Sequence, residues 1–382
     1  MHLCSPYRDE ARLLAEGIRA GKGLRAQGAG VDATCIPQLV TSDPALAVSG
    51  AHIVLMVAPA FAHDSLLHAV VPHLEPGAYL GVMPARSGFE FAAGHHLTAA
   101  GRHDVTIFGF NTLPWACRIA SYGQLVEIHG VKDEVALAAS PPGPASSLAR
   151  FFQEALGIRV AILPDFTALT LANMGQVIHP GIMYGLFLHN TGVSYEEDRV
   201  PPFYQSVDDQ IAAILEAMSR EVLDVARALK EITGGRLAGS GIVGVREWLL
   251  SSYSGQIEDT SSLARAFATN RAYRGLPVPS IPGPGGQRQP DFQSRYLTED
   301  VPYGLVVVRG LADLYRVPVP VITGVISVTS GWMGREYLLN GRLEGRDVVA
   351  SRCPQRYGID DMAALISAVT RQQQLGEVIA HG

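Results

Sequence analysis

The first 163 residues alternate apolar runs of strand length with segments of helical periodicity. HIVLMVA, residues 52–58, is a continuous apolar run, as expected of a strand buried on both faces. FAHDSLLHAVVPHL follows with apolar residues at helical spacing, and AYLGVMP, FEFAAGHHLTAA and DVTIFGF continue the alternation. Pro44 fits the first position of another helix, with Asp43 as its cap. Further strands are predicted at residues 118–123, 125–131, 135–140 and 158–164. Strands alternating with helices predict a parallel, doubly wound α/β sheet.

From about residue 166 the pattern becomes helical. Residues 208–232 form a long amphipathic segment that ends at Gly234 and Gly235, and shorter helical segments occur at 245–253, 302–315 and 360–369. SIPGPGGQRQP, residues 280–290, is predicted as a surface loop, because no strand leads into its glycines and prolines interrupt it. A chain of 382 residues exceeds the usual size of one core. We therefore predict an α/β nucleotide-binding domain at residues 1–165 and an all-α domain at 166–382.

Composition excludes several classes of protein. The formal net charge of −6 gives no basic surface, so nucleic acid is not an expected partner. No apolar run approaches the ~18–20 residues that span a bilayer, and no signal-peptide pattern opens the chain, so we expect a cytoplasmic protein without a membrane partner. Cys4, Cys35, Cys117 and Cys353 form no C-x-x-C pair. They are predicted to be reduced, mostly buried thiols, with no disulfide framework and no metal site.

The beginning of the chain departs from a dinucleotide-binding fold, which opens with a strand, a G-x-G-x-x-G turn and a helix. Here Leu3–Ser5 resembles the end of a second strand, and residues 8–18 the helical segment after it. The absent first strand is central in the order 3-2-1-4-5-6, so its loss leaves buried peptide groups unpaired. We expect roughly 25–30 residues upstream of Met1, lost by truncation or a misassigned start. The alternative is a domain rebuilt to do without them.

Two short stretches carry the main catalytic candidates. In NMGQVIHPGIMYG, His179 supplies an imidazole, a side chain that can act both as an acid and as a base, although a hydrogen-bonded core histidine is the alternative. In SRYLTEDVPYG, the guanidinium of Arg295 can grip a carboxylate with two hydrogen bonds, or be only a surface charge. A buried Asp300 behind an imidazole would fix its tautomer, or Asp300 could be only a helix cap.

Further candidates follow predicted strands, where doubly wound folds bind ligands. Thr112 offers a hydroxyl after one strand and Arg86 a guanidinium after another. For Thr112 the alternative is a turn residue that satisfies its own backbone, and Arg86 carries the same ambiguity. Pro59 ends the strand at the expected cofactor face, and His63 lies one helical turn beyond. An ordinary strand-to-helix connection is the favoured interpretation of His63.

Taken together, four stretches resemble the octopine/nopaline (opine) dehydrogenase family: TSDPALAVSGAHIVLMVAPAFAH, NTLPWACRI, NMGQVIHPGIMYG and SRYLTEDVPYGL. The similarity runs over essentially the whole chain in the same order. It implies a Rossmann-type N-terminal domain and an all-α opine dehydrogenase C-terminal domain, with the active site in the cleft between them. It also implies NAD(P)H-dependent reductive condensation of an L-amino acid with a 2-oxo acid such as pyruvate or 2-oxoglutarate.

The resemblance implies a role for each matching residue. His179 corresponds to the catalytic histidine of the family and Asp300 to its acidic partner. Arg295 corresponds to the arginine that binds the oxo-acid carboxylate, Thr112 to a polar substrate contact, and Trp248 to a residue lining the amino-acid pocket. Arg86 is a further substrate-binding candidate.

For the cofactor, the glycine-rich loop of the family would lie upstream of Met1. Ser5 and Arg8 stand where the adenosine ribose is expected, and this pair leans slightly towards a 2′-phosphate and NADPH over NADH, although Asp9 and Glu10 follow. Pro59 and His63 complete the cofactor candidates.

Two other functions stay open at this point. One is a nicotinamide-dependent dehydrogenase of the glycerol-3-phosphate or hydroxy-acid type, and the other is a truncated, non-catalytic homologue. No motif names the amino acid, the oxo acid or the oligomeric state, so a homodimer also stays open.

Overall fold

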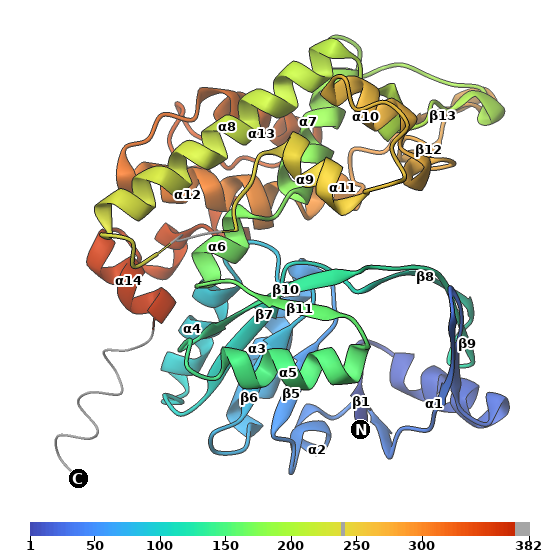
Figure 1. Ribbon diagram of the computed structural model, residues 1–382, viewed down its shortest axis with the longest axis vertical. Helices are drawn as coiled ribbons and strands as arrows, with labels where there is room; N and C mark the ends of the chain where they lie inside the picture. Colours follow the sequence, from blue (N-terminus) through green and yellow to red (C-terminus); the bar gives the residue numbers. More distant parts are fainter. Residues whose placement is uncertain (238–240, 371–382) are drawn as a thin grey trace. The chain divides into compact units, whose positions relative to one another are not determined.

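The computed structural model describes residues 1–237 and 241–370. Its contacts divide the chain into two compact units (Figure 1). The first, here the α/β unit, comprises residues 1–85, 90–169 and 367–370 of the described chain. The second, here the helical unit, comprises residues 170–366 together with Arg86–Phe89. A short piece of the first half of the sequence therefore belongs to the helical unit.

A five-stranded sheet forms the centre of the α/β unit, with the strand order β11-β10-β7-β6-β5. β5 (Ile53–Met56), β6 (Tyr79–Val82) and β7 (Thr106–Phe110) are parallel, while β10 (Glu134–Ser140) runs antiparallel to β7 and parallel to β11 (Arg159–Ile162). The helices between them are α3 (His63–Val70), α4 (Phe89–Ala99) and α5 (Ala145–Leu156). The predicted alternation of strands and helices is confirmed, with one antiparallel junction that the apolar pattern did not reveal.

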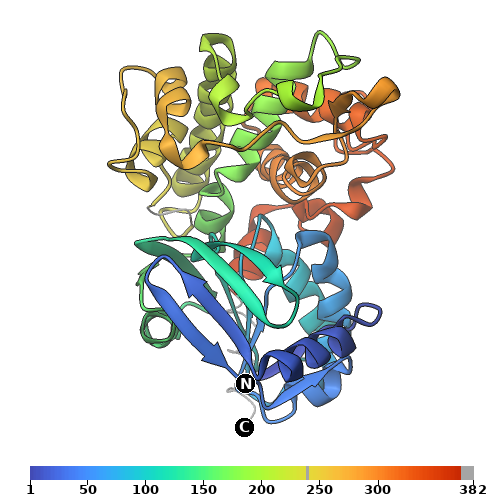
Figure 2. The ribbon, with the colours of Figure 1, turned by 90° about the vertical axis from the view of Figure 1, so that its right-hand side faces the viewer.

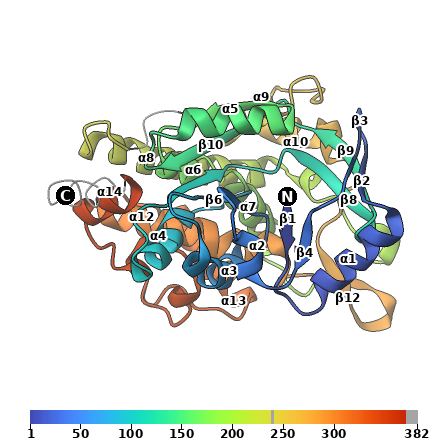
Figure 3. The ribbon, with the colours of Figure 1, turned by 90° about the horizontal axis from the view of Figure 1, so that it is seen from below.

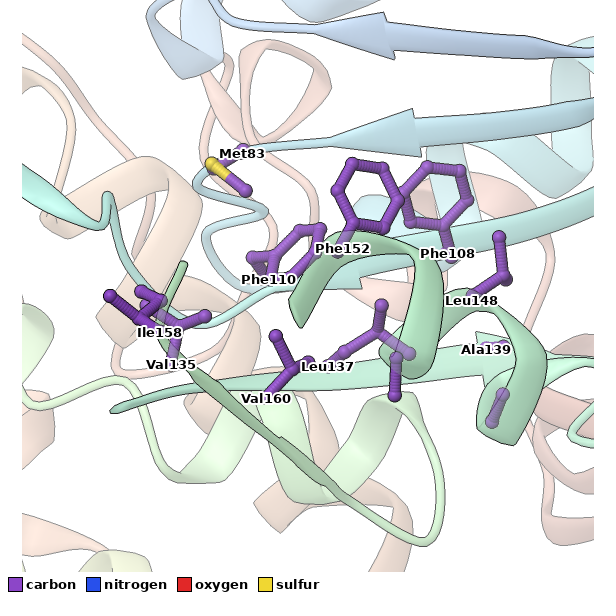
Figure 4. Close-up of a cluster of buried hydrophobic side chains, with 12 residues drawn as sticks. Met83, Phe108, Phe110, Val135, Leu137, Ala139, Leu148, Phe152, Ile158 and Val160 are labelled. Atoms are coloured by element: carbon purple, nitrogen blue, oxygen red, sulfur yellow. The ribbon is translucent and has the colours of Figure 1, made fainter. Parts of the chain in front are cut away.

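Aromatic side chains fill the space between α5 and the sheet (Figure 4). Phe108 and Phe110 project from β7 against Phe152 of α5, with ring centroids 5.3 and 5.0 Å from that ring. The ring of Phe108 also covers Gly81 of the neighbouring strand, where an added Cβ would lie 2.0 Å from the ring. Gly81 is therefore required by the packing of this core.

The beginning of the chain forms a separate two-stranded parallel sheet, β1 (His2–Cys4) with β4 (Leu39–Thr41). Figure 3 shows this pair beside α2 (Pro44–Val48). The carboxylate of Asp43 accepts a hydrogen bond of 2.9 Å from the amide of Ala45, and Pro44 occupies the first turn, so the predicted cap is confirmed. α1 (Glu10–Gly21) follows β1, as the helical periodicity of residues 8–18 predicted.

A four-stranded sheet, in the order β3-β2-β9-β8, completes the α/β unit (Figure 2). β9 (Leu125–Val131) coincides with a predicted strand, and β8 (Trp115–Ser121) overlaps the strand predicted at 118–123 but begins three residues earlier. β2 (Leu24–Gly28) and β3 (Val31–Cys35) were not foreseen. Their sequences, LRAQG and VDATC, are short and carry no apolar run, and neither strand contains a buried residue. Pairing with β9 stabilises β2, and sequence periodicity does not detect such pairing.

Long helices build the helical unit around α7 (Gly175–Phe187) and α8 (Asp209–Ile232). Gly181 and Gly185 of α7 lie against α8, where added Cβ atoms would approach Leu215 and Ile211 to 2.5 and 2.6 Å. These glycines allow the close packing of the two helices. The helices that follow β11 also include α6 (Phe166–Leu171), α9 (Val245–Ser252), α10 (Leu263–Thr269), α11 (Arg295–Thr298), α12 (Val306–Tyr315), α13 (Pro320–Trp332) and α14 (Met362–Thr370).

Two expectations from the sequence are wrong in detail. The predicted loop at 280–290 contains a short antiparallel hairpin, β12 (Ser280–Pro282) with β13 (Arg288–Pro290). Gly285 and Gly286 supply the positive φ angles of its turn. The cysteines are free, as predicted, but only Cys353 is buried, because Cys4 and Cys35 lie on open faces of short strands.

Among the described residues, the helices are all too short or too polar to span a bilayer.

Candidate active site

His179 lies in the first half of α7, directly before Pro180. Proline has no amide hydrogen to donate to the preceding helical turn, yet the helix continues through it to Phe187. The imidazole is 18% exposed. Both of its nitrogens have partners: Nδ1 lies 2.8 Å from Oδ2 of Asp300, and Nε2 lies 2.8 Å from the hydroxyl of Tyr204.

Asp300 follows α11 and precedes a π-helical turn at Val301–Leu305. It stands at the helix-cap position, but its side chain makes no capping hydrogen bond and faces His179 instead. The carboxylate is 1% exposed. An ionised carboxylate accepts hydrogen bonds only, so Nδ1 of His179 carries the hydrogen of this pair, and Nε2 is the acceptor when the imidazole is neutral.

Arg86 neutralises this buried carboxylate. Its Nη1 donates to Oδ1 of Asp300 at 3.0 Å, and its Nη2 to Glu299 at 3.4 Å. Burial alone would raise the pKa of Asp300, but the charge of Arg86 and the hydrogen bond from His179 outweigh burial and lower this pKa below its usual value. Asp300 therefore stays ionised behind the imidazole at neutral pH.

The segment 86–89 is fixed to the helical unit by its own backbone and hydroxyl groups. The amide of Ser87 donates to the carbonyl of Tyr303 at 2.9 Å, and the Ser87 hydroxyl donates to the amide oxygen of Gln176 at 2.9 Å. Arg86 itself has a φ of 54°, a left-handed conformation that is uncommon for a residue other than glycine. Such a conformation persists only where the surroundings enforce it, and here it directs the guanidinium to Asp300.

Arg295, on α11, contacts Glu299, the second carboxylate that Arg86 also contacts. Its Nε and Nη2 donate to Oε2 of Glu299 at 2.9 and 2.6 Å. The Arg295 side chain is 64% exposed while that of Glu299 is 3% exposed. Arg295 is therefore anchored by a buried acid and presents much of its guanidinium to the surroundings.

Aromatic rings enclose the imidazole. The ring of Tyr296 stacks on His179, with a centroid distance of 4.2 Å and an interplanar angle of 9°. Tyr204 in turn stacks on Tyr273 at 4.0 Å. Sequence reasoning missed Tyr204, Tyr296 and the anchoring role of Glu299. Tyr296 and Glu299 lie within the SRYLTED stretch and could have been found there, whereas no local motif marks Tyr204.

The remaining substrate candidates lie in different surroundings. Trp248 of α9 packs edge-on against Tyr253 at 6.1 Å, and Tyr253 contacts Tyr273 at 5.0 Å, so Trp248 joins the same aromatic group. Thr112 lies in the α/β unit, where its hydroxyl accepts a hydrogen bond from the ammonium of Lys132.

Of the cofactor candidates, His63 is fully buried, and its Nε2 donates to the carbonyl of Ala58 at 2.9 Å, as in an ordinary strand-to-helix connection. Pro59 precedes a short helical turn after β5. Ser5 donates to the carboxylate of Glu10 at 2.6 Å, and the guanidinium of Arg8 lies over the ring of Tyr7.

Apolar side chains are exposed where the chain leaves β5. Val57 and Phe61, which flank Pro59 after β5, are large exposed apolar side chains. Doubly wound sheets bind nucleotides at this edge, and apolar side chains there can cover a planar ring. The sequence reasoning did not single out either residue.

Comparison with known proteins places this geometry in a family. The chain matches the family described as NAD/NADP octopine/nopaline dehydrogenase, alpha-helical domain, over residues 162–333. It is 36% identical over 355 residues to an opine dehydrogenase of Haliotis discus hannai. The aligned region covers 92% of this chain and 86% of the relative.

Two solved structures are similar over nearly the full length. They are octopine dehydrogenase with NADH and L-arginine, and the same enzyme with NADH and pyruvate, with TM-scores of 0.86 and 0.84. Each is 32% identical and covers 96% of this chain and 91% of the other. The predicted fold class, a Rossmann-type domain with a helical domain, is thereby confirmed. The chain belongs to the octopine/nopaline (opine) dehydrogenase family, and it is an NAD(P)-dependent oxidoreductase that joins an amino acid to a 2-oxo acid by reductive condensation.

Proposed function

We propose that His179 is the proton carrier of this reaction and that Asp300 orients its imidazole and stabilises the protonated form. We also propose that Arg295 binds the carboxylate of the oxo acid. The observation that carries this proposal is the chain of contacts from Arg86 through Asp300 to Nδ1 of His179. A buried, ionised carboxylate fixes one tautomer of the imidazole and stabilises the imidazolium once it forms. An ordinary core histidine needs no such buried charge.

The chemistry requires one group that works in both directions. The amino group must lose a proton to attack the ketone, and the oxygen of the resulting carbinolamine must gain a proton to leave as water. An imidazole can take the first proton and return it for the second step. NADH, when bound, supplies hydride to the carbon of the imine.

Arg295→Met is expected to raise the KM for the oxo acid at least about tenfold, because a charge-assisted hydrogen bond is worth about 1.5–3 kcal/mol. The kcat should change less, since Arg295 contacts neither His179 nor Asp300 directly. Steady-state kinetics with the oxo acid varied at saturating amino acid checks this. Arg271→Met, a change to an exposed arginine that donates to a backbone carbonyl, is the control. An unchanged KM would remove Arg295 from the carboxylate site.

For the oxo acid, we propose a monocarboxylate such as pyruvate over a dicarboxylate such as 2-oxoglutarate. Arg295 has an accessible guanidinium, whereas Arg86 already contacts two carboxylates and is 18% exposed. One open guanidinium suits one carboxylate. The pyruvate in the related octopine dehydrogenase structure supports this choice. Trp248 is proposed to contact the amino-acid side chain, with Thr112 as a further polar contact.

For the cofactor, we propose NADH over NADPH, against the slight lean of the sequence. Glu10 accepts from Ser5 just after β1 and places a carboxylate where a ribose 2′-hydroxyl is favoured and a 2′-phosphate is repelled. Arg8 acts in the opposite direction but lies over Tyr7. Pro59, Val57 and Phe61 are proposed to cover the cofactor ring. Quenching of protein fluorescence by each dinucleotide tests this, and tighter binding of NADPH would reverse the assignment.

The proposed function as a whole is tested by turnover. NADH should be oxidised only when an amino acid and a 2-oxo acid are both present, and mass spectrometry should find the secondary-amine product. Omission of either substrate is the control. Oxidation with an oxo acid alone would show a hydroxy-acid dehydrogenase, and the roles proposed for His179 and Arg295 in the condensation would then fail.

A further inference from the structure

The nitrogen through which His179 must exchange protons does not face open space. Nδ1 is held by Asp300, and Nε2 lies 2.8 Å from the hydroxyl of Tyr204. Tyr296 stacks against one face of the ring. A substrate that is to exchange a proton with Nε2 must therefore displace Tyr204 or exchange the proton through it.

Tyr204 is held in a way that opposes displacement. Tyr204 is the first residue of a short 3₁₀ turn, Tyr204–Ser206, and is 8% exposed. Its ring stacks on Tyr273 with an interplanar angle of 15°, and Tyr273 is hydrogen-bonded to Tyr253. Phe203, directly before it, is fully buried. Moving Tyr204 would break this aromatic stack, whereas proton exchange through the hydroxyl requires no movement.

A hydroxyl is suited to this position because it donates one hydrogen and accepts others. It can donate to Nε2 of the neutral imidazole and accept from Nε2–H of the imidazolium. Burial raises the pKa of Tyr204 well above its ordinary value, so the group stays a phenol at neutral pH. The phenolate is therefore not populated, and the hydroxyl can donate its proton only while it accepts another.

We propose that Tyr204 is a proton-relay residue between His179 and the reacting substrates, which rests on the proposed role of His179. In the dehydration step the Tyr204 hydroxyl gives its proton to the carbinolamine oxygen while Nε2–H of the imidazolium gives its proton to Tyr204. The C–O bond breaks, water leaves, and the nitrogen lone pair forms the C=N bond. In the preceding step protons move the opposite way, from the amine through Tyr204 to Nε2.

Tyr204→Phe tests the relay, because phenylalanine keeps the ring stack and removes only the hydroxyl. We expect kcat to fall about ten- to a hundredfold, the loss of one hydrogen bond to a charged group, with both KM values within about threefold. The dependence of kcat on the deuterium fraction of the solvent should be curved in the unaltered chain, as two protons move together, and linear in the variant. Tyr273→Phe, which removes a hydroxyl from the same stack away from His179, is the matched control and should retain kcat and the curvature.

The outcomes separate the relay from its alternatives. An unchanged or increased kcat in Tyr204→Phe would mean that substrates displace Tyr204, and the relay would be wrong. An equal loss in Tyr273→Phe would show a packing effect and would also overturn it. If the phenylalanine variant unfolds, a difluorotyrosine at position 204 keeps the shape and makes the phenol more acidic; an unchanged pH–rate profile would then contradict the relay. If Tyr204→Phe is unaffected while His179→Asn is inactive, only the relay fails, and a fully active His179→Asn overturns the proposed function as well.

Discussion

His179→Asn should lower kcat by about 10²–10⁴-fold, the usual contribution of a general acid–base group. The amide of asparagine can still donate to Asp300 and so keeps the buried carboxylate hydrogen-bonded, but it neither accepts nor releases a proton near neutral pH. The loss should therefore appear in kcat, with similar affinities for both substrates. Initial rates of NADH oxidation, with amino acid and oxo acid varied in turn, measure the effect.

His189→Asn provides the matched control, because His189 is an exposed histidine just beyond the end of α7. Its kinetics and thermal stability should equal those of the unaltered chain. Near-normal kcat in His179→Asn would leave the residue as a hydrogen-bonded core histidine, the alternative that the sequence left open.

Arg86→Met should destabilise the protein by about 3–5 kcal/mol, because it leaves two buried carboxylates without their shared cation. Asp300 and Glu299 are 1% and 3% exposed, so water cannot replace the guanidinium. The free energy of unfolding from urea titration measures the loss. Arg227→Met is the control: Arg227 pairs with Asp224, the two side chains are 65% and 49% exposed, and this change should cost less than about 1 kcal/mol.

The loss of stability in Arg86→Met should be largest near neutral pH and smaller at acid pH. In the unaltered chain the pKa of Asp300 lies below its unfolded value, so its contribution to stability is present above that value, near 3.9, and is lost as the pH falls through the folded pKa. Without Arg86, burial dominates and raises this pKa, so the variant gains stability as the pH falls and Asp300 becomes protonated. The difference in unfolding free energy should therefore narrow towards acid pH. A difference that is small at neutral pH, or that widens on acidification, would contradict the role assigned to Arg86.

Much of the fold follows from local patterns in the sequence. The continuous apolar runs of β5, β6 and β7 and the periodicity of α8 are strong signals, and the cap of α2 is set by two adjacent residues. β2 and β3 carry no such signal, because their stability depends on pairing with β9. The antiparallel direction of β10 is likewise a property of the assembled sheet, and no residue in VALAAS encodes it.

The candidate site was accessible to sequence reasoning only in part. His179, Arg295 and Asp300 stand in short stretches with distinctive chemistry, and the structure brings His179 and Asp300 into contact. Arg86 was expected to meet substrate, yet it faces Asp300 across a sequence separation of 214 residues. Tyr204 reaches His179 because helix packing brings two distant segments together, so neighbouring residues give no indication of it.

The placement of Arg86–Phe89 in the helical unit has a consequence for how the protein can be made and divided. During synthesis, the arginine that neutralises Asp300 leaves the ribosome long before Asp300 does, and it must wait for most of the helical unit to be translated. A fragment that starts at residue 170 would contain His179, Tyr204 and Asp300 but not their cation. The two halves of the sequence therefore cannot be exchanged independently. A chimera that takes its helical unit from a relative must also take the ARSGF segment from that relative.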